Sequence, residues 1–369
     1  MEEFVKWIDC IEDPRQQSKV WYTMQEIILI VFCATLSGVY EWKYIEIWAR
    51  EYENYLKQYL EYRHGIPSHD TIERVIGMVS TEYLQRTYNT WVEKIRCQED
   101  LNLCKLICID GKTQCGSRTE KSKPNHIVTA WAHDGGFSLG QKTVDQKSNE
   151  IKAIPELLKV LNIKGSIVTI DAMGTQTVIA ETIREKSAHY VLALKENQKT
   201  LFNDVKLYFE DEDHLKKIKE KGNYYETLDK DHGKADIRRY YQTSAIGWLD
   251  GKEKWKGLKT IGMVERKHGD ATERRYYISS LSCNAEEFAY AVRGHWSVET
   301  MHWYLDVLFK EDSNHTLNKT AAVNQNLIRK MCLSMLKHIN LYKPNTSMRQ
   351  KQFIISLNPV KYLDYVMSL

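Results

Sequence analysis

Two aspartates follow apolar stretches that have the character of buried strands. Asp110 ends the run LCKLICID and is followed by Gly111, while Asp171 ends the run SIVTID and is followed by Ala172. In an open α/β sheet, reactive groups gather just beyond the ends of the strands. If the two runs are neighbouring strands, the two carboxylates lie close together. A single aspartate at a strand end is also typical of a turn or a helix cap, and that alternative stays open for each residue.

Two carboxylates at close range require a cation. Like charges in a partly buried site repel, so Asp110 and Asp171 cannot both stay ionised without a counterion. Carboxylate oxygens are hard ligands and suit Mg²⁺ or Mn²⁺. Three carboxylates can hold a pair of such ions about 3.5–4 Å apart, the arrangement used for in-line displacement at phosphorus. The chemistry indicated is metal-dependent phosphoryl transfer, provided that a third carboxylate joins the two aspartates.

The stretch HWSVETMHWYLD (295–306) offers that third carboxylate. At 3.6 residues per turn, its polar residues form one stripe along a helix, and they are His295, Glu299, His302 and Asp306. We expect the helix to dock against the sheet and to aim Glu299 at the two aspartates, because its long side chain spans the gap. The residues expected to face the core are Trp296, Val298, Trp303 and Leu305. Such stripes also occur on solvated helix faces, so the spacing alone leaves both interpretations open.

The elements that position these residues fall into four predicted regions. Residues 1–100 carry apolar residues at spacings of three and four and are expected to be helical. Their break HGIPSHD contains Ser68 and Asp70 as candidate helix caps. These helices form either a DNA-binding module or a plain bundle.

The remaining regions predict a mixed α/β fold. In residues 101–199 the first strand is followed by two strands joined at Asp134-Gly135-Gly136, and then by alternating helices and strands. Residues 200–282 are rich in tyrosine and basic residues, and we expect a mainly β insertion there. Residues 283–369 return to helix after the capping pair Asn284 and Glu287.

Composition restricts the class of protein without choosing a function. The 369 residues are 43% hydrophobic and 27% charged, with a net charge of +3, which is ordinary for a globular protein and neither demands nor excludes nucleic acid. The eight cysteines contain no CxxC pair, and we expect Cys104 and Cys108 to share a strand face as packed thiols. The apolar segment 27–40 is too short for a membrane span. We expect no membrane association and a place in the reducing cytoplasm.

Eight stretches, taken in order, carry a resemblance to a known family. They are DPR (13–15), IPSHDT (66–71), IDGKT (109–113), KSNEIKAIPELL (147–158), VTIDAMGTQ (168–176), ALKENQ (193–198), HGK (232–234) and HWSVETMHWYLDVLFKED (295–312). With these motifs the chain resembles, nearly from end to end, the DDE transposases of bacterial insertion sequences, in their H-repeat-associated branch.

The resemblance implies a fold, a site and an activity. It implies an RNase H-like core with Asp110, Asp171 and Glu299 as the DDE triad, and a β-rich insertion before the helix that carries Glu299. It implies that the triad binds Mg²⁺, with Mn²⁺ as a substitute, as two ions. The implied activity is metal-dependent cleavage at the terminal inverted repeats of a mobile element, followed by joining of the freed 3′-hydroxyls to target DNA. Because two ends must be held together, we expect a homodimer on double-stranded DNA.

Two stretches depart from the pattern of the wider group. That group often shows a Tyr-Arg-Glu-Lys signature around the helix glutamate, and here Val292, His295 and Asp306 stand at the other three positions. The group's HGRIETR appears as HGKADIR (232–238), which keeps Arg238. Neither departure affects the triad, so we expect an active enzyme.

Eight further residues are candidates for contacts with DNA. The lysines among them follow proposed strands, where a lysine can position a phosphate. The arginines have tyrosine neighbours and offer a basic and aromatic surface, although strand alternation puts only one arginine of each Arg-Arg pair on a given side. Turn chemistry and ordinary exposure are the alternatives. The candidates are Lys112, Lys195, Asn197, Gln198, Arg238, Arg275, His295 and His302.

Two other functions stay open on the sequence alone. One is a catalytically silent DNA-binding protein derived from a transposase, which would use residues 1–100 and the insertion. The other is a carboxylate-bridged di-iron protein, because Glu61-x-x-His64 and Glu299-x-x-His302 match its helical motif. The strand-rich middle of the chain argues against the four-helix core that a di-iron site needs.

Overall fold

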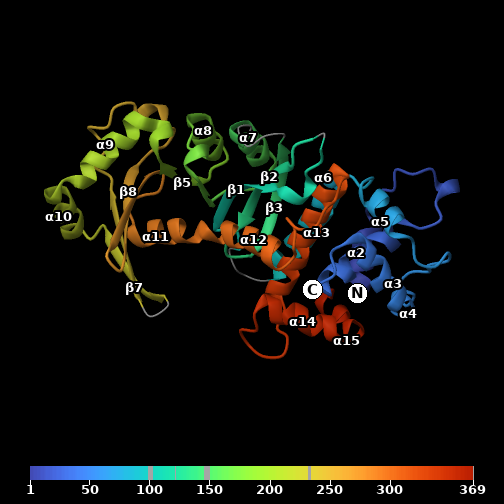
Figure 1. The fold of residues 1–369 in the computed structure, drawn as a ribbon. Coiled ribbons are helices and arrows are strands. Elements are labelled where there is room, and N and C mark those ends of the chain that lie inside the picture. The colour runs from blue at the N-terminus through green and yellow to red at the C-terminus, as the bar shows by residue number, and fades with distance from the viewer. Residues whose placement is uncertain (99–102, 121, 145–149, 232–233, 369) are drawn as a thin grey trace.

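The computed structural model describes residues 1–98, 103–120, 122–144, 150–231 and 234–368. The predicted boundary at residue 100 and parts of the motifs at 147–158 and 232–234 lie outside these residues. Figure 1 shows a sheet in the middle of the molecule, helices on both of its faces and a helical bundle at one end. This is the mixed α/β class that the sequence predicts.

Five strands form the core of the sheet, namely β1 (Leu106–Gln114), β2 (Asn125–Ala132), β3 (Phe137–Val144), β4 (Ile167–Ile170) and β5 (His189–Leu194). Their order is β3-β2-β1-β4-β5. The first three are antiparallel to one another along the sheet, whereas β4 runs parallel to β1 and β5 runs parallel to β4. Helices α7 (Glu150–Val160) and α8 (Thr177–Glu185) pack on this sheet. The order and directions confirm the predicted RNase H-like core.

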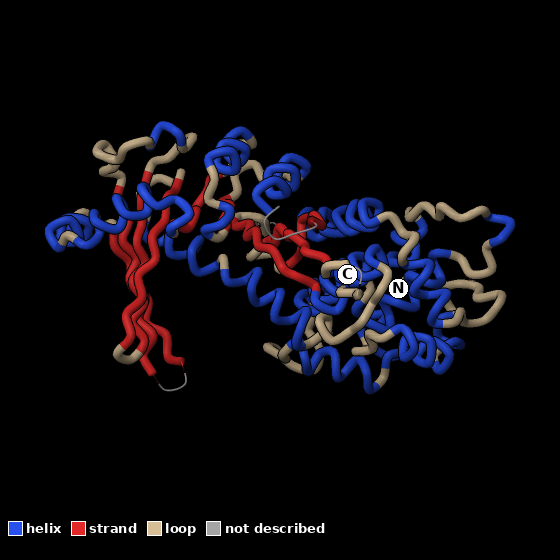
Figure 2. Tube along the Cα trace, turned by 45° about the horizontal axis from the view of Figure 1, so that its top comes forward, coloured by secondary structure: helices blue, strands red, loops and turns tan. Residues whose placement is uncertain are grey.

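Four more strands continue the same sheet beyond β5. They are β6 (Tyr224–Asp231), β7 (Lys234–Thr243), β8 (Thr260–His268) and β9 (Ala271–Ser279), and β9 pairs antiparallel with β5. Figure 2 shows them as a long ribbon that extends away from the body. The β-rich insertion is therefore present, but it begins with two helices, α9 (Lys199–Glu210) and α10 (Glu212–Glu220). These two helices differ from the mainly β structure expected there, because their many charged residues obscure the apolar face.

Helices α11 (Ala285–Gly294) and α12 (Trp296–Val307) run one after the other along the sheet, on the face opposite α7 and α8 (Figure 1). Asn284 caps α11 by accepting hydrogen bonds from the backbone amides of Glu286 and Glu287, so one half of the predicted capping pair forms. The backbone amide of Asn284 donates to Gln242 Oε1 and not to Glu287. The chain approaches β1 closely where the two helices meet, because Gly294 has no side chain to hold it away. A Cβ at residue 294 would lie 2.2 Å from Leu106 Cδ2 on β1.

The helical bundle is built from both ends of the chain. Its N-terminal helices are α1 (Glu2–Asp9), α2 (Met24–Leu36), α3 (Trp42–Glu51), α4 (Glu53–Leu56), α5 (His69–Ile76) and α6 (Thr81–Gln98), and its C-terminal helices are α13 (Lys319–His338), α14 (Met348–Leu357) and α15 (Pro359–Val366). The apolar helix α2 lies at the centre, and α13, α14 and α15 all pack against it. None of the helices in the described part of the chain has both the length and the apolar character needed to cross a membrane.

The cysteines in the described residues are free thiols. Cys104 lies in the turn before β1, so the expected pairing of Cys104 and Cys108 on one strand face is wrong. The side chain of Cys97 lies outside the described part of the chain.

Candidate active site

Asp110 and Asp171 lie at neighbouring positions of adjacent strands. Ile109 of β1 pairs with Ile170 of β4, and the two aspartates are the next residue along each strand. Asp171 follows the end of β4, but Asp110 does not end β1, which continues to Gln114 and pairs there with β2 alone. The expected proximity is therefore present, although for Asp110 it comes from the end of the β1–β4 pairing and not from the end of a strand.

Asp171 also serves as a turn residue. Its Oδ1 accepts hydrogen bonds from the backbone amides of Met173 (3.1 Å) and Gly174 (3.2 Å), which begin the short turn η4 (Ala172–Gly174). These two bonds fix the orientation of the carboxylate at the edge of the sheet.

Glu299 reaches the same region from α12. The helix docks through Val298, Met301 and Leu305, which are fully buried. Trp296 and Trp303, predicted to be core residues, are instead 40% and 55% exposed. They lie three residues before and four residues after Glu299, so they share its open side of the helix.

One cleft of about 540 Å³ brings the three acidic residues together. Asp110, Asp171 and Glu299 all line it, along with the basic residues Lys195, Arg274, Arg275 and His295. The three carboxyl groups of the triad do not form a tight cluster. Among the described residues, the one group of three such side chains with ligand atoms within 4.8 Å of one another lies elsewhere, at Asp306, Glu311 and Asp312.

The charges in the cleft favour a cation. Burial and the charge of Asp110 raise the pKa of Glu299, and burial together with the same charge raises the pKa of Asp171. Burial also acts to raise the pKa of Asp110, but His302, the backbone amide of Gly111 and His295 together outweigh it, and the pKa is lowered. The positive charge around the three carboxylates does not balance their negative charge. Carboxylate oxygens are hard ligands, so the site suits a divalent metal ion of the Mg²⁺ type.

The two candidate histidines lie inside the site. His302 Nδ1 is 3.4 Å from Asp110 Oδ2, and its side chain is 13% exposed. His295 Nδ1 forms a hydrogen bond of 3.0 Å with Thr169 Oγ1 on β4, and burial lowers the pKa of His295. Both rings therefore contact the elements that carry the aspartates, and these contacts do not support the expected role of His302 in binding DNA.

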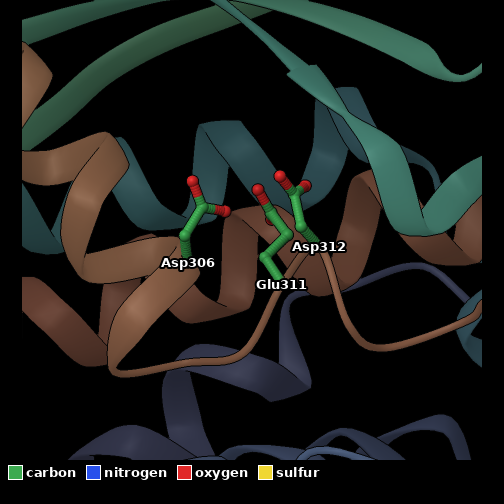
Figure 3. A group of neighbouring side chains, drawn as sticks. All are labelled: Asp306, Glu311 and Asp312. Carbon is green, nitrogen blue, oxygen red and sulfur yellow. The ribbon is translucent and has the colours of Figure 1, made fainter.

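Lys112 lies in the acidic cluster of Asp306, Glu311 and Asp312. Figure 3 shows the three carboxyl groups turned to the same side. The Lys112 Nζ is 2.8 Å from Asp306 Oδ1, 3.2 Å from Glu311 Oε2 and 3.1 Å from Asp312 Oδ1. The ammonium group thus takes the place where a metal ion would bind, and its ion pairs contradict the expected contact with DNA.

Two polar residues after β5 support the loop that follows Asp171. Asn197 Nδ2 donates to the carbonyl of Ala172 at 2.6 Å, and Gln198 Nε2 donates to the carbonyl of Thr175 at 3.0 Å. These internal bonds argue against their expected role as DNA contacts. Lys195, by contrast, is exposed and lines the cleft.

The arginines of the insertion divide between the two faces of the sheet, as strand alternation predicts: Arg238 and Arg275 share one face, and Arg239 and Arg274 share the other, where both pair with Glu265. Arg275 is about half exposed, lines the cleft, pairs with Glu273 at 2.8 Å and lies 5.9 Å from the ring of Trp296. Arg238 is 9% exposed and pairs with Asp236 and Asp229, so its expected contact with DNA is contradicted by burial.

The di-iron interpretation is wrong. Glu61 and His64 do not lie on a helix. Glu61 is largely exposed and pairs with Arg63, while His64 packs against Trp21 in the helical bundle. The two halves of the proposed motif therefore do not meet.

Comparisons with known proteins identify the family. A family model described as "Transposase DDE domain" matches residues 105–335, and the model described as "DDE_Tnp_1-associated" matches residues 5–92. YncI of Escherichia coli O157:H7, named as a candidate transposase, is 34% identical over 100% of this chain and 95% of its own. YhhI of Escherichia coli K12, named as an H repeat-associated candidate transposase, is 34% identical over 97% of this chain and 96% of its own.

Among solved structures, the chain aligns with the piggyBac transposase in a synaptic complex with hairpin DNA. The alignment covers 100% of this chain and 76% of the other, with a TM-score of 0.42 and 12% identity.

Proposed function

Because the chain belongs to the family of transposases that carry the DDE domain, we propose that it cleaves DNA at the ends of a mobile element and joins the freed ends to target DNA. The catalytic residues in this proposal are Asp110, Asp171 and Glu299. One observation carries it. The three side chains come from β1, from the end of β4 and from α12, and they line a single cleft.

The same three residues would hold the divalent metal ions, two Mg²⁺ or Mn²⁺ in our proposal. When bound by these residues, such ions would supply Lewis-acid activation of the attacking oxygen and charge stabilisation of the leaving oxygen in an in-line displacement at phosphorus. The raised pKa values of Asp171 and Glu299 support this assignment, because they reflect burial and carboxylate repulsion that a cation relieves.

Neighbouring side chains prepare the carboxylates for this role. His302 lies against Asp110 and lowers its pKa, which keeps it ionised as a ligand must be. Asn197 and Gln198 hold the loop after Asp171 through two of its carbonyls. These contacts limit the movement of Asp110 and of the loop that follows Asp171, and the positioning of catalytic groups lowers the barrier of such a reaction.

The proposed partner is double-stranded DNA, both at the inverted repeats of the element and at the target. Lys195 and Arg275 are the contacts with the phosphate backbone that we favour, because both line the cleft and are open to solvent. Two ends must be joined in one reaction, so we propose a homodimer on DNA. The reaction would take place in the cytoplasm of a bacterial cell.

Alanine substitution of the triad tests the catalytic part of the proposal. Asp110→Ala, Asp171→Ala and Glu299→Ala should each abolish cleavage of a duplex that carries the inverted repeat flanking the coding sequence, in Mg²⁺ or Mn²⁺. Binding of the same duplex, measured by gel shift, should be retained. Asp250→Ala is the control, because this aspartate is exposed and lies outside the cleft.

Two outcomes would contradict the proposal. Cleavage by one of the three variants would remove that residue from the catalytic triad. A wild-type protein that binds the repeat but cleaves it with neither metal would be a catalytically silent DNA-binding derivative. That second candidate has a precedent by name, since the Escherichia coli K12 relative YbfQ, 37% identical over 77 residues, is called an inactive transposase.

A further inference from the structure

Every second residue of β1 from Cys108 onward contacts α12 or the turn that follows it. We call this set of contacts the β1–α12 ladder. Its members are Cys108 with Ser297 (3.6 Å), Asp110 with His302 (3.4 Å), Lys112 with Asp306 (2.8 Å) and Gln114 with Glu311 (3.5 Å). The partners ascend in number together, so the helix and the strand run in the same direction.

The ladder depends on a match between two repeats. Two residues along a strand advance by about 6.6–6.8 Å, and four or five residues along a helix advance by about 6.0–7.5 Å. Successive side chains of one face of β1 therefore meet successive turns of α12. A shift of the helix along its axis would break all of these contacts together, so the ladder fixes how far along β1 the helix lies.

Glu299 lies within this register. It is on the turn between Ser297 and His302, and it reaches the cleft only if α12 keeps its axial position relative to Asp110. Outside the triad, Lys112 makes ion pairs with Glu311 and Asp312 of the turn after α12 and with Asp306 of α12 itself. The pair with Asp306 is the one of these that lies on the helix. Because both ends are ionic, this contact is the strongest candidate for a part that holds the register.

We propose that Lys112 is a positioning residue, whose ammonium group holds α12 in the register at which Glu299 faces Asp110 and Asp171. The inference rests on the proposed function, since it concerns the same triad. Lys112 stands two residues after Asp110 on the same face of β1, and Asp306 stands two turns after Glu299 on α12. The ion pair of Lys112 and Asp306 thus connects β1, which carries Asp110, to α12, which carries Glu299.

The surroundings of Lys112 leave it no exposed charge for DNA. Its side chain is 12% exposed, and three carboxylates from α12 and the following turn converge on it. Glu311 has a second cationic partner, because Arg329 Nη1 lies 3.5 Å from its Oε1. Asp306 pairs with Lys112 alone among the described residues, so the loss of this lysine leaves Asp306 without its ion-pair partner.

Lys112→Met tests the proposal, because methionine keeps much of the length and removes the charge. We expect single-turnover cleavage by the full chain to slow by about 10- to 100-fold, the range in which small misplacements of catalytic groups act. Affinity for the end duplex should stay unchanged. Lys112→Arg should recover part of the rate, and Asp306→Asn should slow cleavage as well, because it removes the other side of the contact.

Lys142→Met is the matched control. It makes the same chemical change on the same sheet and breaks an exposed ion pair, that of Lys142 with Glu156 at 2.7 Å. We expect it to cleave at the wild-type rate. Thermal unfolding of each variant shows which are folded, and if Lys112→Met is not, the rates of Lys112→Arg and Asp306→Asn decide the matter.

Two results would overturn the positioning role. Wild-type cleavage by Lys112→Met, or by Asp306→Asn where the former does not fold, would show that the ion pair is not needed. Weaker DNA binding by Lys112→Met combined with undiminished cleavage by Asp306→Asn would make Lys112 a DNA contact. Both differ from failure of the proposed function, which would appear as a wild-type protein without cleavage.

Discussion

Lys330 is a fully buried residue of α13 that connects the bundle to the sheet. Its Nζ donates hydrogen bonds of 2.7 Å to Thr129 Oγ1 on β2 and to Gln141 Oε1 on β3. Burial lowers its pKa to about 7, while an unfolded lysine has a pKa of about 10.4. Between these values the unfolded chain binds more protons than the folded chain. The stability contribution of Lys330 therefore rises with pH across this window and is constant below it.

Lys330→Met removes this dependence. We expect the free energy of unfolding of the wild type, relative to that of the variant, to increase by on the order of 2 kcal/mol between pH 7 and pH 9. Urea unfolding of both proteins at the two pH values measures the difference. If the two curves shift equally with pH, the lysine is already charged when folded and the prediction is wrong.

The position of a candidate site residue was predictable from the sequence where it depends on the residues next to it in the chain. The apolar runs before Asp110 and Asp171 predict two strands, and these strands do place the aspartates side by side. Ion pairs between residues far apart in the chain have no comparable pattern in the sequence. Lys112 contacts Asp312, which is 200 residues away, so the sequence offered no reason to expect that its charge is already paired. The assignment of the triad to catalysis stays a prediction.

At the scale of elements, the phase of α12 shows why two tryptophans were misplaced. The regular spacing of Trp296 and Trp303 predicts that both face the core, but the buried stripe is Val298, Met301 and Leu305. A helix that presents Glu299 to an open cleft must also expose the residues three before and four after it. If Glu299 must face the cleft, Trp296 and Trp303 must be exposed as well. Their hydrophobicity alone predicts that they are buried.

The approach of α11 and α12 to β1 depends on Gly294. A methyl group at this position would lie 2.2 Å from Leu106 Cδ2 and 3.3 Å from a carbon of His133. We expect Gly294→Ala to lower the free energy of unfolding by about 1–3 kcal/mol, as overpacking does, and to slow cleavage by moving α12. Gly247→Ala is the control, since its Cβ would meet nothing within 4 Å. Equal stability of the two variants in urea would contradict this account.

At the scale of the whole molecule, the two ends of the chain share one core. Helix α13 packs against α2, α5 and α6 of the bundle and against β3 of the sheet, so it connects the two. The pattern of apolar residues predicted helices at both ends of the chain. The same pattern could not predict that the helices of the two ends pack together, because the apolar face of a helix does not show which other helix it will contact. A DNA contact made by the N-terminal helices would therefore act on the sheet through α13.

Asp364 of α15 tests this shared core. Its carboxylate accepts hydrogen bonds of 2.7 Å from the hydroxyl groups of Tyr55 and Tyr59, which come from the other end of the chain. Asp364→Ala leaves both hydroxyls without this acceptor, and Tyr55 is buried. We expect the free energy of unfolding to fall by about 2–3 kcal/mol, whereas Asp364→Asn, which keeps one acceptor oxygen, should lose less.

The way in which the variant unfolds distinguishes a shared core from a local contact. If both ends form one cooperative unit, Asp364→Ala lowers the midpoint of helix loss and of tryptophan fluorescence change together, and unfolding stays a single transition. Asp270→Ala, a change of an exposed aspartate in the insertion, should leave both midpoints unchanged. An early, separate transition of α14 and α15 in the Asp364 variant would mean that the C-terminal helices only rest on the bundle and do not stabilise it.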